Sequence, residues 1–228
     1  IPCYAPLSGG QCGCNNPNCS SIGKHPRTNS GFKDATTDIK QIQHWWTQWP
    51  ESNIGIITGQ QSGLVVLDVD GDVGNESLCN LIQQHGPLPS TLSAITGRGQ
   101  HFYFIYPKEY CIKNSAGKIG ENIDIRAEGG FVIAPPSRHA LGHEYQWEDE
   151  NLSPAMLPDW LLKLITSNST TSNVSNPIPL SGDQFLSSAC GKIRFAKEGS
   201  RNDTLNRQSF MVGQRIASGL IGHANVEI

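Results

Sequence analysis

The sequence predicts an α+β fold, in which a sheet of short strands is accompanied by helices. The run from Gly63 to Gly71 leads four apolar residues into Asp68-Val69-Asp70, and a short run bounded by glycines is typical of a buried central strand. Alternation of apolar and polar residues over 123–126 predicts another strand. Apolar residues at helical spacing over 38–49 predict an amphipathic helix.

Length and composition agree with a soluble globular protein. The chain has 228 residues, 37% of them hydrophobic and 16% charged, and no apolar run is long enough to span a membrane. The net charge of −3 gives no overall attraction to nucleic acid, so DNA contact requires a local basic groove. Three of the seven cysteines lie within eight residues, which favours an intracellular, cytoplasmic protein with a metal cluster over a disulfide scaffold.

The N-terminal loop 9–27 is rich in Gly, Asn and Ser and carries four metal-ligating side chains: Cys12, Cys14, Cys19 and His25. Three thiolates and an imidazole suit tetrahedral Zn²⁺, although the C-x-C-x4-C-x5-H spacing differs from the usual C-x2-C pair. A structural zinc would order a loop that has almost no apolar residues. The alternative is three free thiols on a mobile loop. Cys3 is expected to pack in the core.

Basic side chains accompany this loop. Lys24 and Arg27 flank His25, and Lys33 lies a little further along the chain. These cations could contact phosphates, and an ordered loop would hold Lys24 and Arg27 toward a template or the 5′ end of a primer. A solvated loop face is the alternative.

The elements before the central strand can be assigned in order. Asp38 is expected to cap the helix that Pro50 ends, with an apolar face formed by Ile39, Ile42, Trp46 and Trp49. A strand over 53–58 then turns at 59–63 into the central strand. After the central strand, a helix is expected over 75–85, closed by Gly86.

Asp68 and Asp70 project from the same side of the central strand, because strand residues two apart share a face. Two like charges at the end of a buried strand repel each other, and a divalent cation removes that cost. Carboxylate oxygens suit Mg²⁺ or Mn²⁺. The alternative is a solvated acidic turn.

Two later strands carry further polar side chains. A glycine-rich turn, Gly97-Arg98-Gly99, precedes an aromatic strand that His101 opens, and such turns bring backbone amides close to a ligand. Over 123–126, Ile123 and Ile125 face a core while Asp124 and Arg126 share the other face. His101 as a structural hydrogen-bonding residue, and Asp124 as half of an ion pair, are the alternatives.

The chain closes with a turn at 128–130, a strand over 131–134 ended by two prolines, and a helix over 157–165. The predicted domains are a catalytic domain at 1–165, a flexible linker at 166–180 and the start of a helical accessory domain at 181–228. The linker is assigned because it is almost entirely polar.

Three segments together resemble a known family: Leu67-Asp68-Val69-Asp70, Gly99-Gln100-His101 and Ile123-Asp124-Ile125-Arg126. Their order is that of the D-x-D, small-x-His and final acidic motifs of the primase-polymerase (PrimPol) branch of the archaeo-eukaryotic primase superfamily. Similar flanking segments are Gly23-Lys24-His25-Pro26, Asn53-Ile54-Gly55, Glu128-Gly129-Gly130 and Pro135-Pro136-Ser137. Glu198-Gly199-Ser200-Arg201-Asn202 resembles a segment that often lies after this domain in phage and plasmid replication proteins.

The resemblance implies a catalytic core with an RRM-like mixed or antiparallel sheet and helices behind it. It further implies that Asp68, Asp70 and Asp124 hold two Mg²⁺ or Mn²⁺ ions and that His101 binds the triphosphate of the incoming nucleotide. The other nucleotide ligands that it implies are Arg126, Ser137, Arg98 and Lys33.

The expected activity is that of a template-dependent DNA primase/polymerase, a nucleotidyltransferase of DNA replication. Its partners would be single-stranded DNA template, primer, NTP or dNTP, and a replicative helicase domain after residue 228. It would act in the cytoplasm, associated with the nucleoid.

Two other functions are consistent with parts of the sequence. Leu-Asp-Val-Asp-Gly resembles the nucleophile motif of haloacid-dehalogenase phosphatases, with Asp68 as nucleophile and Asp70 as acid/base, but no later Gly-Asp-x-x-x-Asp pattern occurs. A non-catalytic origin-binding module using the zinc loop is the other alternative, and the intact acidic triad argues against it.

Overall fold

The computed structural model describes residues 1–167 and residue 212. The predicted linker 166–180 lies outside the described residues from 168 onward, as do the helical segment 181–228, except for Val212, and the Glu198–Asn202 segment.

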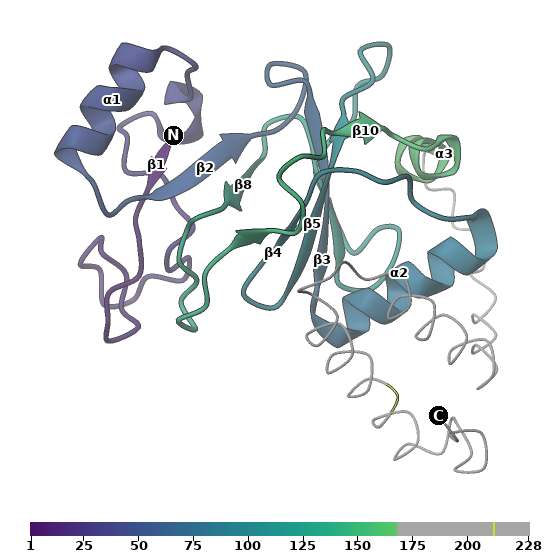
Figure 1. The fold of residues 1–228 in the computed structure, drawn as a ribbon, viewed down its shortest axis with the longest axis horizontal. Helices are drawn as coiled ribbons and strands as arrows, with labels where there is room; N and C mark the ends of the chain where they lie inside the picture. The colour runs from purple at the N-terminus through teal and green to yellow at the C-terminus, as the bar shows by residue number, and fades with distance from the viewer. Residues whose placement is uncertain (168–211, 213–228) are drawn as a thin grey trace. The chain divides into compact units, whose positions relative to one another are not determined.

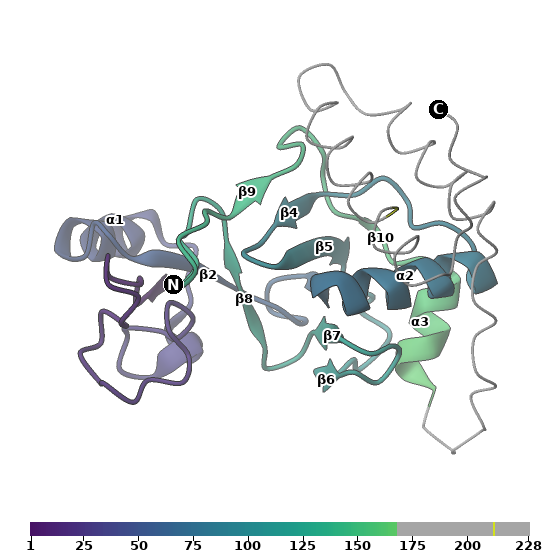
Figure 2. The ribbon, with the colours of Figure 1, turned by 90° about the horizontal axis from the view of Figure 1, so that it is seen from below.

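The larger sheet is built on the predicted central strand, β3 (Leu64–Asp70). β3 pairs antiparallel with β5 (Gly99–Ile105) on one side and β7 (Ile123–Arg126) on the other. The strand order is β6-β7-β3-β5-β4-β9, with β10 paired to β5 (Figures 1 and 2). The shorter strands are β4 (Ser93–Ile95), β6 (Ser115–Ala116), β9 (Gln146–Trp147) and β10 (Ala155–Met156). This α+β architecture with an antiparallel sheet confirms the predicted fold class.

A smaller antiparallel sheet consists of β1 (Pro2–Cys3), β2 (Asn53–Ile57) and β8 (Phe131–Ala134). Helix α1 (Ile39–Gln48) and the short 3-10 helix η1 (Gly31–Asp34) lie beside it (Figures 1 and 2). Asp38 caps α1 by accepting a 3.0 Å hydrogen bond from the Lys40 amide, as predicted. Cys3 is fully buried in the core of this sheet, which confirms its packing role.

The predicted apolar face of α1 needs one correction. Ile39 is 69% exposed, whereas Trp45, which was not assigned to that face, is the buried residue of the helix. The buried face is centred between Ile42 and Trp45, so Ile39, in the first turn, lies at its margin. Trp46 and Trp49 pack against the core as expected.

Helices α2 (Gly71–His85) and α3 (Asp159–Thr166) cover one face of the larger sheet (Figure 2). Val65, Leu67 and Val69 of β3 point to that face. They form one core with four helix residues, Leu78, Leu81, Leu161 and Ile165. The prediction that α2 begins at Asn75 was wrong, because β3 runs directly into the helix. Gly71, with a φ of 66°, supplies the bend at this junction, and Asp70 becomes the residue that precedes the helix.

The opposite face of β3 presents Val66, Asp68 and Asp70. Val66 packs with Tyr103 of β5 and Val132 of β8. The smaller sheet therefore covers the Val66 end of this face, and the functional side chains lie farther along β3.

Candidate functional site

Strand register brings three of the predicted residues into one row. Asp68 lies directly opposite His101 of β5 and directly opposite Asp124 of β7. Because strand residues two apart share a face, Arg126 and Tyr103 lie on the same side as this row. We call Asp68, His101 and Asp124 the carboxylate row.

Arg126 joins the two carboxylates of the row. Its Nη2 lies 2.7 Å from Asp124 Oδ2 and 3.2 Å from Asp68 Oδ2, and its Nε donates to Asp68 Oδ2 at 3.3 Å. His101 Nε2 lies 3.3 Å from Asp68 Oδ1. The backbone amide of Gly117 donates to Asp124 Oδ1 at 3.1 Å. The guanidinium thus provides positive charge between two carboxylates that would otherwise repel each other.

Burial and charge act in opposite directions on Asp68, whose side chain is 12% exposed. Burial raises the pKa of this carboxyl, whereas the hydrogen bond and charge of His101 and the charge of Arg126 lower it. The net pKa is lowered, so Asp68 stays ionised at neutral pH.

His101 is buried, and one polar atom of His101 and one of its neighbour Tyr103 lack hydrogen-bond partners among the described residues. Within the described residues, neither His101 Nδ1 nor the Tyr103 hydroxyl has a hydrogen-bond partner. The rings of Tyr103 and Tyr145 both lie with their centroids 6.2 Å from the His101 ring. Burial, together with the charge of Asp68, raises the pKa of both tyrosine hydroxyls, so they are neutral. Buried polar atoms without partners are rare in native proteins, and a catalytic or ion-binding role is one reason for them.

Asp70 lies two residues beyond the row, opposite Gly99, and immediately before α2. Its side chain does not cap the helix. Within the described residues, metal-ligating atoms are gathered closely only at the Cys/His loop, so Asp70 and the row form a more open set of carboxylates. The donor set nevertheless fits a hard cation, because three carboxylates share one sheet face and a guanidinium already stands between two of them.

The Cys/His loop gathers its four predicted ligands. The ligand atoms of Cys12, Cys14, Cys19 and His25 all lie within 4.8 Å of one another. His25 Nε2 is 3.3 Å from Cys12 Sγ and 3.5 Å from Cys19 Sγ. Burial raises the pKa of Cys12, but hydrogen bonds to the backbone at Gly23 and Cys14 and to neighbouring side chains lower it to about 6. The thiolate, the form that binds metal, is therefore favoured.

The predicted basic residues of this loop have different surroundings. The Arg27 guanidinium lies over the rings of Tyr4 and Trp49, at 4.8 and 4.9 Å from their centroids, and donates to Ser52 Oγ at 3.2 Å. Arg27 is therefore held by cation–π packing, and its expected contact with a template or primer stays a prediction. Lys24 is exposed.

Among the described residues, no hydrogen bond or ion pair joins the row to Arg98, Ser137 or Lys33. Arg98 is exposed in the turn before β5, where its carbonyl oxygen accepts a 3.1 Å bond from the Gly71 amide. Ser137 is buried, and its hydroxyl accepts a 2.8 Å bond from the Ile54 amide. Lys33 lies in η1, beside the smaller sheet.

Sequence reasoning missed two residues near the row, His139 and Tyr145. Both lie in the segment after Pro135-Pro136, which carries no regular periodicity. The run of His and Tyr side chains there was the available signal, but only the fold shows that it returns to β5.

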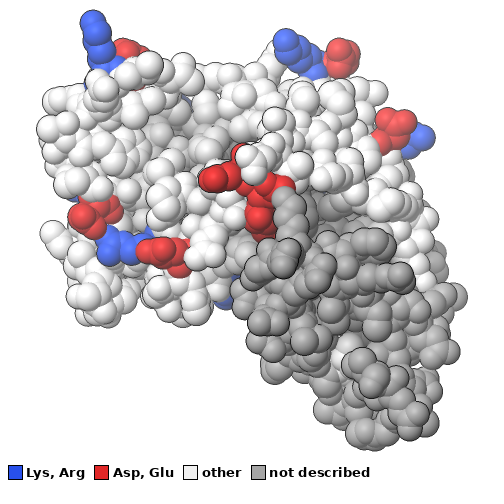
Figure 3. Space-filling model, viewed as in Figure 1, with Lys and Arg blue, Asp and Glu red and all other residues white. Residues whose placement is uncertain are grey.

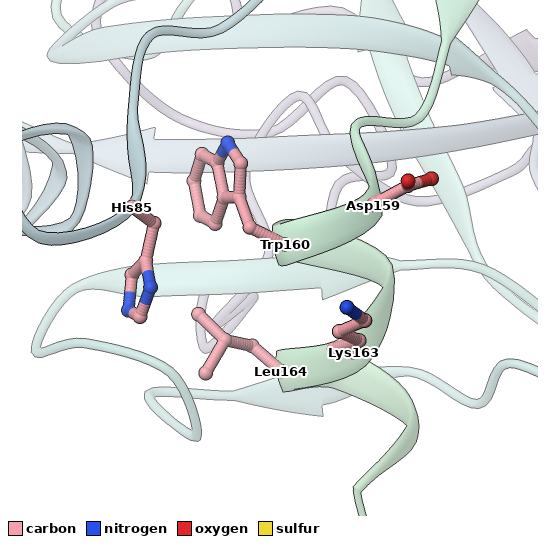
Figure 4. A pocket seen from close by; sticks show the side chains of 5 residues that line it. All are labelled: His85, Asp159, Trp160, Lys163 and Leu164. Atoms are coloured by element: carbon pink, nitrogen blue, oxygen red, sulfur yellow. The ribbon is translucent and has the colours of Figure 1, made fainter.

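A pocket of about 510 Å³ lies elsewhere, between α2 and α3, lined by His85, Asp159, Trp160, Lys163 and Leu164 (Figure 4). The rings of His85 and Trp160 stack there, with centroids 5.5 Å apart. Because α2 and α3 cover the face of the sheet opposite the carboxylates, this pocket is separate from the row.

On the face shown in Figure 3, charged side chains are spread thinly except for a group of acidic ones near the middle. On the face shown in Figure 3, blue side chains occur singly or beside red ones and form no continuous basic patch among the described residues.

A family model for the N-terminal domain of bifunctional DNA primase/polymerase matches residues 3–160, more than half of the chain. The chain belongs to this primase/polymerase family. No curated protein matches it. The recognition of the PrimPol branch from the three motifs is thereby confirmed, and with it a general role as a DNA primase/polymerase that uses DNA and nucleotides.

Family membership also favours this role over the two alternatives. The primase/polymerase family generally uses divalent metals, which agrees with the acidic donor set of the row.

In the described part of the chain, no helix has the length and apolar character needed to cross a membrane.

Proposed function

We propose that this domain is a template-dependent DNA primase/polymerase that transfers nucleotides at the carboxylate row. The observation that carries the proposal is the register of β3 with β5 and β7, which sets Asp68 beside both His101 and Asp124 on one sheet face. Each motif taken alone is common, whereas their meeting on one face supports a shared reaction.

In this proposal Asp68, Asp70 and Asp124 hold two Mg²⁺ or Mn²⁺ ions. Bound ions would lower the pKa of the primer 3′-hydroxyl and neutralise negative charge on the phosphates. The carboxylates would then exchange their bonds to Arg126 for the ions, because a guanidinium and a metal ion compete for the same oxygens. Asp70 would have to approach the row, and its place at the junction of β3 and α2 leaves its side chain free of a capping bond.

The other side chains would bind the nucleotide. His101 Nε2 lies 3.3 Å from Asp68 Oδ1. When the carboxylate binds an ion, His101 Nε2 would instead donate a hydrogen bond to the triphosphate. Arg126, released from Asp68 and Asp124, would provide a second cationic donor to phosphate. Arg98 is proposed as a further ligand from the turn before β5. Ser137 and Lys33 would contribute only if a nucleotide extends toward the smaller sheet.

We infer that the Cys/His loop binds a structural Zn²⁺. Four protein ligands leave no open coordination position, so this ion would support folding and take no part in catalysis. The acidic site selects hard cations and the loop selects soft ones, so the two sites should be separable by metal.

The proposed partners are a single-stranded template, a primer, NTP or dNTP, and a replicative helicase domain following this segment. Such an enzyme would work in the cytoplasm, where it is associated with the nucleoid.

The test is primer extension on a defined template with Mg²⁺ and with Mn²⁺. Asp68→Ala combined with Asp70→Ala should abolish incorporation while circular dichroism remains unchanged, because neither carboxylate belongs to the apolar core that packs β3 against α2 and α3. Incorporation by the double variant would contradict the proposal. Hydrolysis of p-nitrophenyl phosphate by the wild type, lost in Asp68→Asn, would instead indicate the phosphatase.

A further inference from the structure

His139 occupies a defined position beside the turn that precedes β5. Its backbone amide donates to the His143 carbonyl at 2.7 Å, and the Tyr145 amide donates to the Ser137 carbonyl at 2.8 Å, so 137–145 folds back on itself. The imidazole packs directly on Gly97, where an added Cβ would lie 2.1 Å from His139 Cγ. Only glycine at position 97 allows the ring to lie there.

One nitrogen of the His139 ring already accepts a hydrogen bond. Nδ1 accepts a 3.2 Å hydrogen bond from the Leu141 amide, which places the proton of the neutral ring on Nε2. The residue is 9% exposed, and Nε2 is not among the buried unpartnered atoms of the described residues. The neutral ring therefore presents one accessible N–H donor.

A line of rings connects His139 to the carboxylate row. The centroid of the His139 ring lies 6.1 Å from that of Tyr145, which in turn lies 6.2 Å from that of His101. His139 is thus on the same side of the sheet as the row, displaced toward the turn that carries Arg98.

Two basic residues, Lys24 and Arg98, act on this imidazole. Burial lowers the pKa of His139, and the charges of Lys24, Arg98 and His143 lower it further, whereas Asp70 raises it. The geometry agrees, because Arg98 follows Gly97, on which the ring packs, and Lys24 follows Gly23, which Asn53 joins to Arg138. The lowered pKa favours the neutral ring.

Asn53 ties this region to the Cys/His loop. Its Nδ2 donates to the Gly23 carbonyl at 2.9 Å and to the Arg138 carbonyl at 2.8 Å, and its Oδ1 accepts from the Arg138 amide at 2.9 Å. Asn53 is 2% exposed. One buried side chain therefore fixes the residue before Lys24 and the residue before His139.

We propose that His139, Lys24 and Arg98 form a binding site for the outer phosphates of the incoming nucleotide, with the Cys/His loop as one wall. This inference rests on the proposed function. His101 is in the row, where the α-phosphate would react, and His139 lies farther along the same face, next to the turn that carries Arg98. The loop would thus serve the nucleotide, whereas the sequence led us to expect a role at the template or primer.

The experiment measures nucleotide affinity by calorimetry, on the full chain with primed template and Mg²⁺. The probes are a dNTP analogue with an α,β-methylene group and the corresponding dNMP. His139→Ala and Lys24→Gln should each lower the affinity for the triphosphate analogue by about 10-fold or more. This is the loss expected for one charge-assisted hydrogen bond. Affinity for the monophosphate should change less than about twofold, because it lacks the outer phosphates.

Two matched variants complete the design. His139→Gln keeps an N–H donor near the Nε2 position and should retain most of the affinity. Lys40→Gln, an exposed lysine of α1, should have no effect. Equal losses for both probes would overturn the inference in favour of base or sugar contact, as would unchanged affinity in His139→Ala.

The outcome also separates this inference from the proposed function. If the wild type extends primers and His139→Ala binds the triphosphate normally, only the inference fails. If the wild type neither binds nucleotide nor extends primers, both fail.

Discussion

Arg126 bridges the two carboxylates of the carboxylate row in this structure. Its guanidinium bonds to Asp68 and Asp124 at distances from 2.7 to 3.3 Å and so provides the positive charge between the two carboxylates. The alternation of 123–126 placed Asp124 and Arg126 on one face. Their ion pair is the alternative that the sequence had left open for Asp124. The ion pair and a metal site are compatible, because carboxylates that attract a guanidinium also attract metal ions.

Replacing Arg126 should therefore change metal binding before any reaction occurs. In Arg126→Gln, Mn²⁺ should bind several-fold more tightly in the absence of nucleotide, because the competing guanidinium is gone. Binding of a dNTP analogue should weaken in the same variant, since a phosphate donor is lost. Titration followed by the electron paramagnetic resonance signal of free Mn²⁺ measures the first effect.

The control is Arg138→Gln, because Arg138 forms a separate ion pair with Glu51 at 2.8 Å. Unchanged or weaker Mn²⁺ binding in Arg126→Gln would show that Arg126 does not compete with the ions.

At the scale of elements, strong local patterns were sufficient for most of the fold. β3, β5, β7 and β8 lie where runs of apolar residues predicted them, as do α1 and α3. Ile123 and Ile125 are buried as their alternation required. These elements could be predicted because burial of one face imposes the side-chain period.

Other elements have no such local signal. The start of α2 was placed four residues late, because the bend at Gly71 lets β3 and α2 join without a loop. The two-residue strands exist only through their pairing with neighbours, which no local pattern encodes. The position of His139 beside Gly97 is likewise a product of tertiary contact.

The Cys/His loop gives a prediction at this scale. The purified chain should retain about one zinc after dialysis against a weak chelator, as expected for a closed four-ligand site. Cys14→Ser should release it. Because Gly23 is bonded to Asn53, loss of the ion should also raise the KM for nucleotide on a preformed primer, while kcat changes less.

Elemental analysis and steady-state kinetics measure these two effects. Cys79→Ser, which alters a cysteine of α2 outside the cluster, is the control. A wild type without zinc would refute the site. Complete loss of extension in Cys14→Ser, as in the Asp68 variant, would show that the two metal sites are not independent.

At the scale of the whole domain, the two faces of the larger sheet have different roles: one packs in the core and the other carries the proposed site. One face is covered by α2 and α3, which bury Val65, Leu67 and Val69 of β3 in one core. The other face carries the carboxylate row, and the smaller sheet and the Cys/His loop border it through Val66, Asn53 and Gly23. A strand with a covered back is a suitable support for a site that must position metal ions precisely.

The central claim is that Asp68, Asp70 and Asp124 hold two divalent ions against a nucleotide. The most direct test is a crystal structure with Mn²⁺, primed template and a dNTP analogue with an α,β-methylene group, with Mn²⁺ located by anomalous scattering. The account predicts two Mn²⁺ peaks bound by these three carboxylates, with Arg126 displaced from between Asp68 and Asp124. Absence of Mn²⁺ at the carboxylates, with nucleotide bound and Arg126 still bridging them, would contradict it.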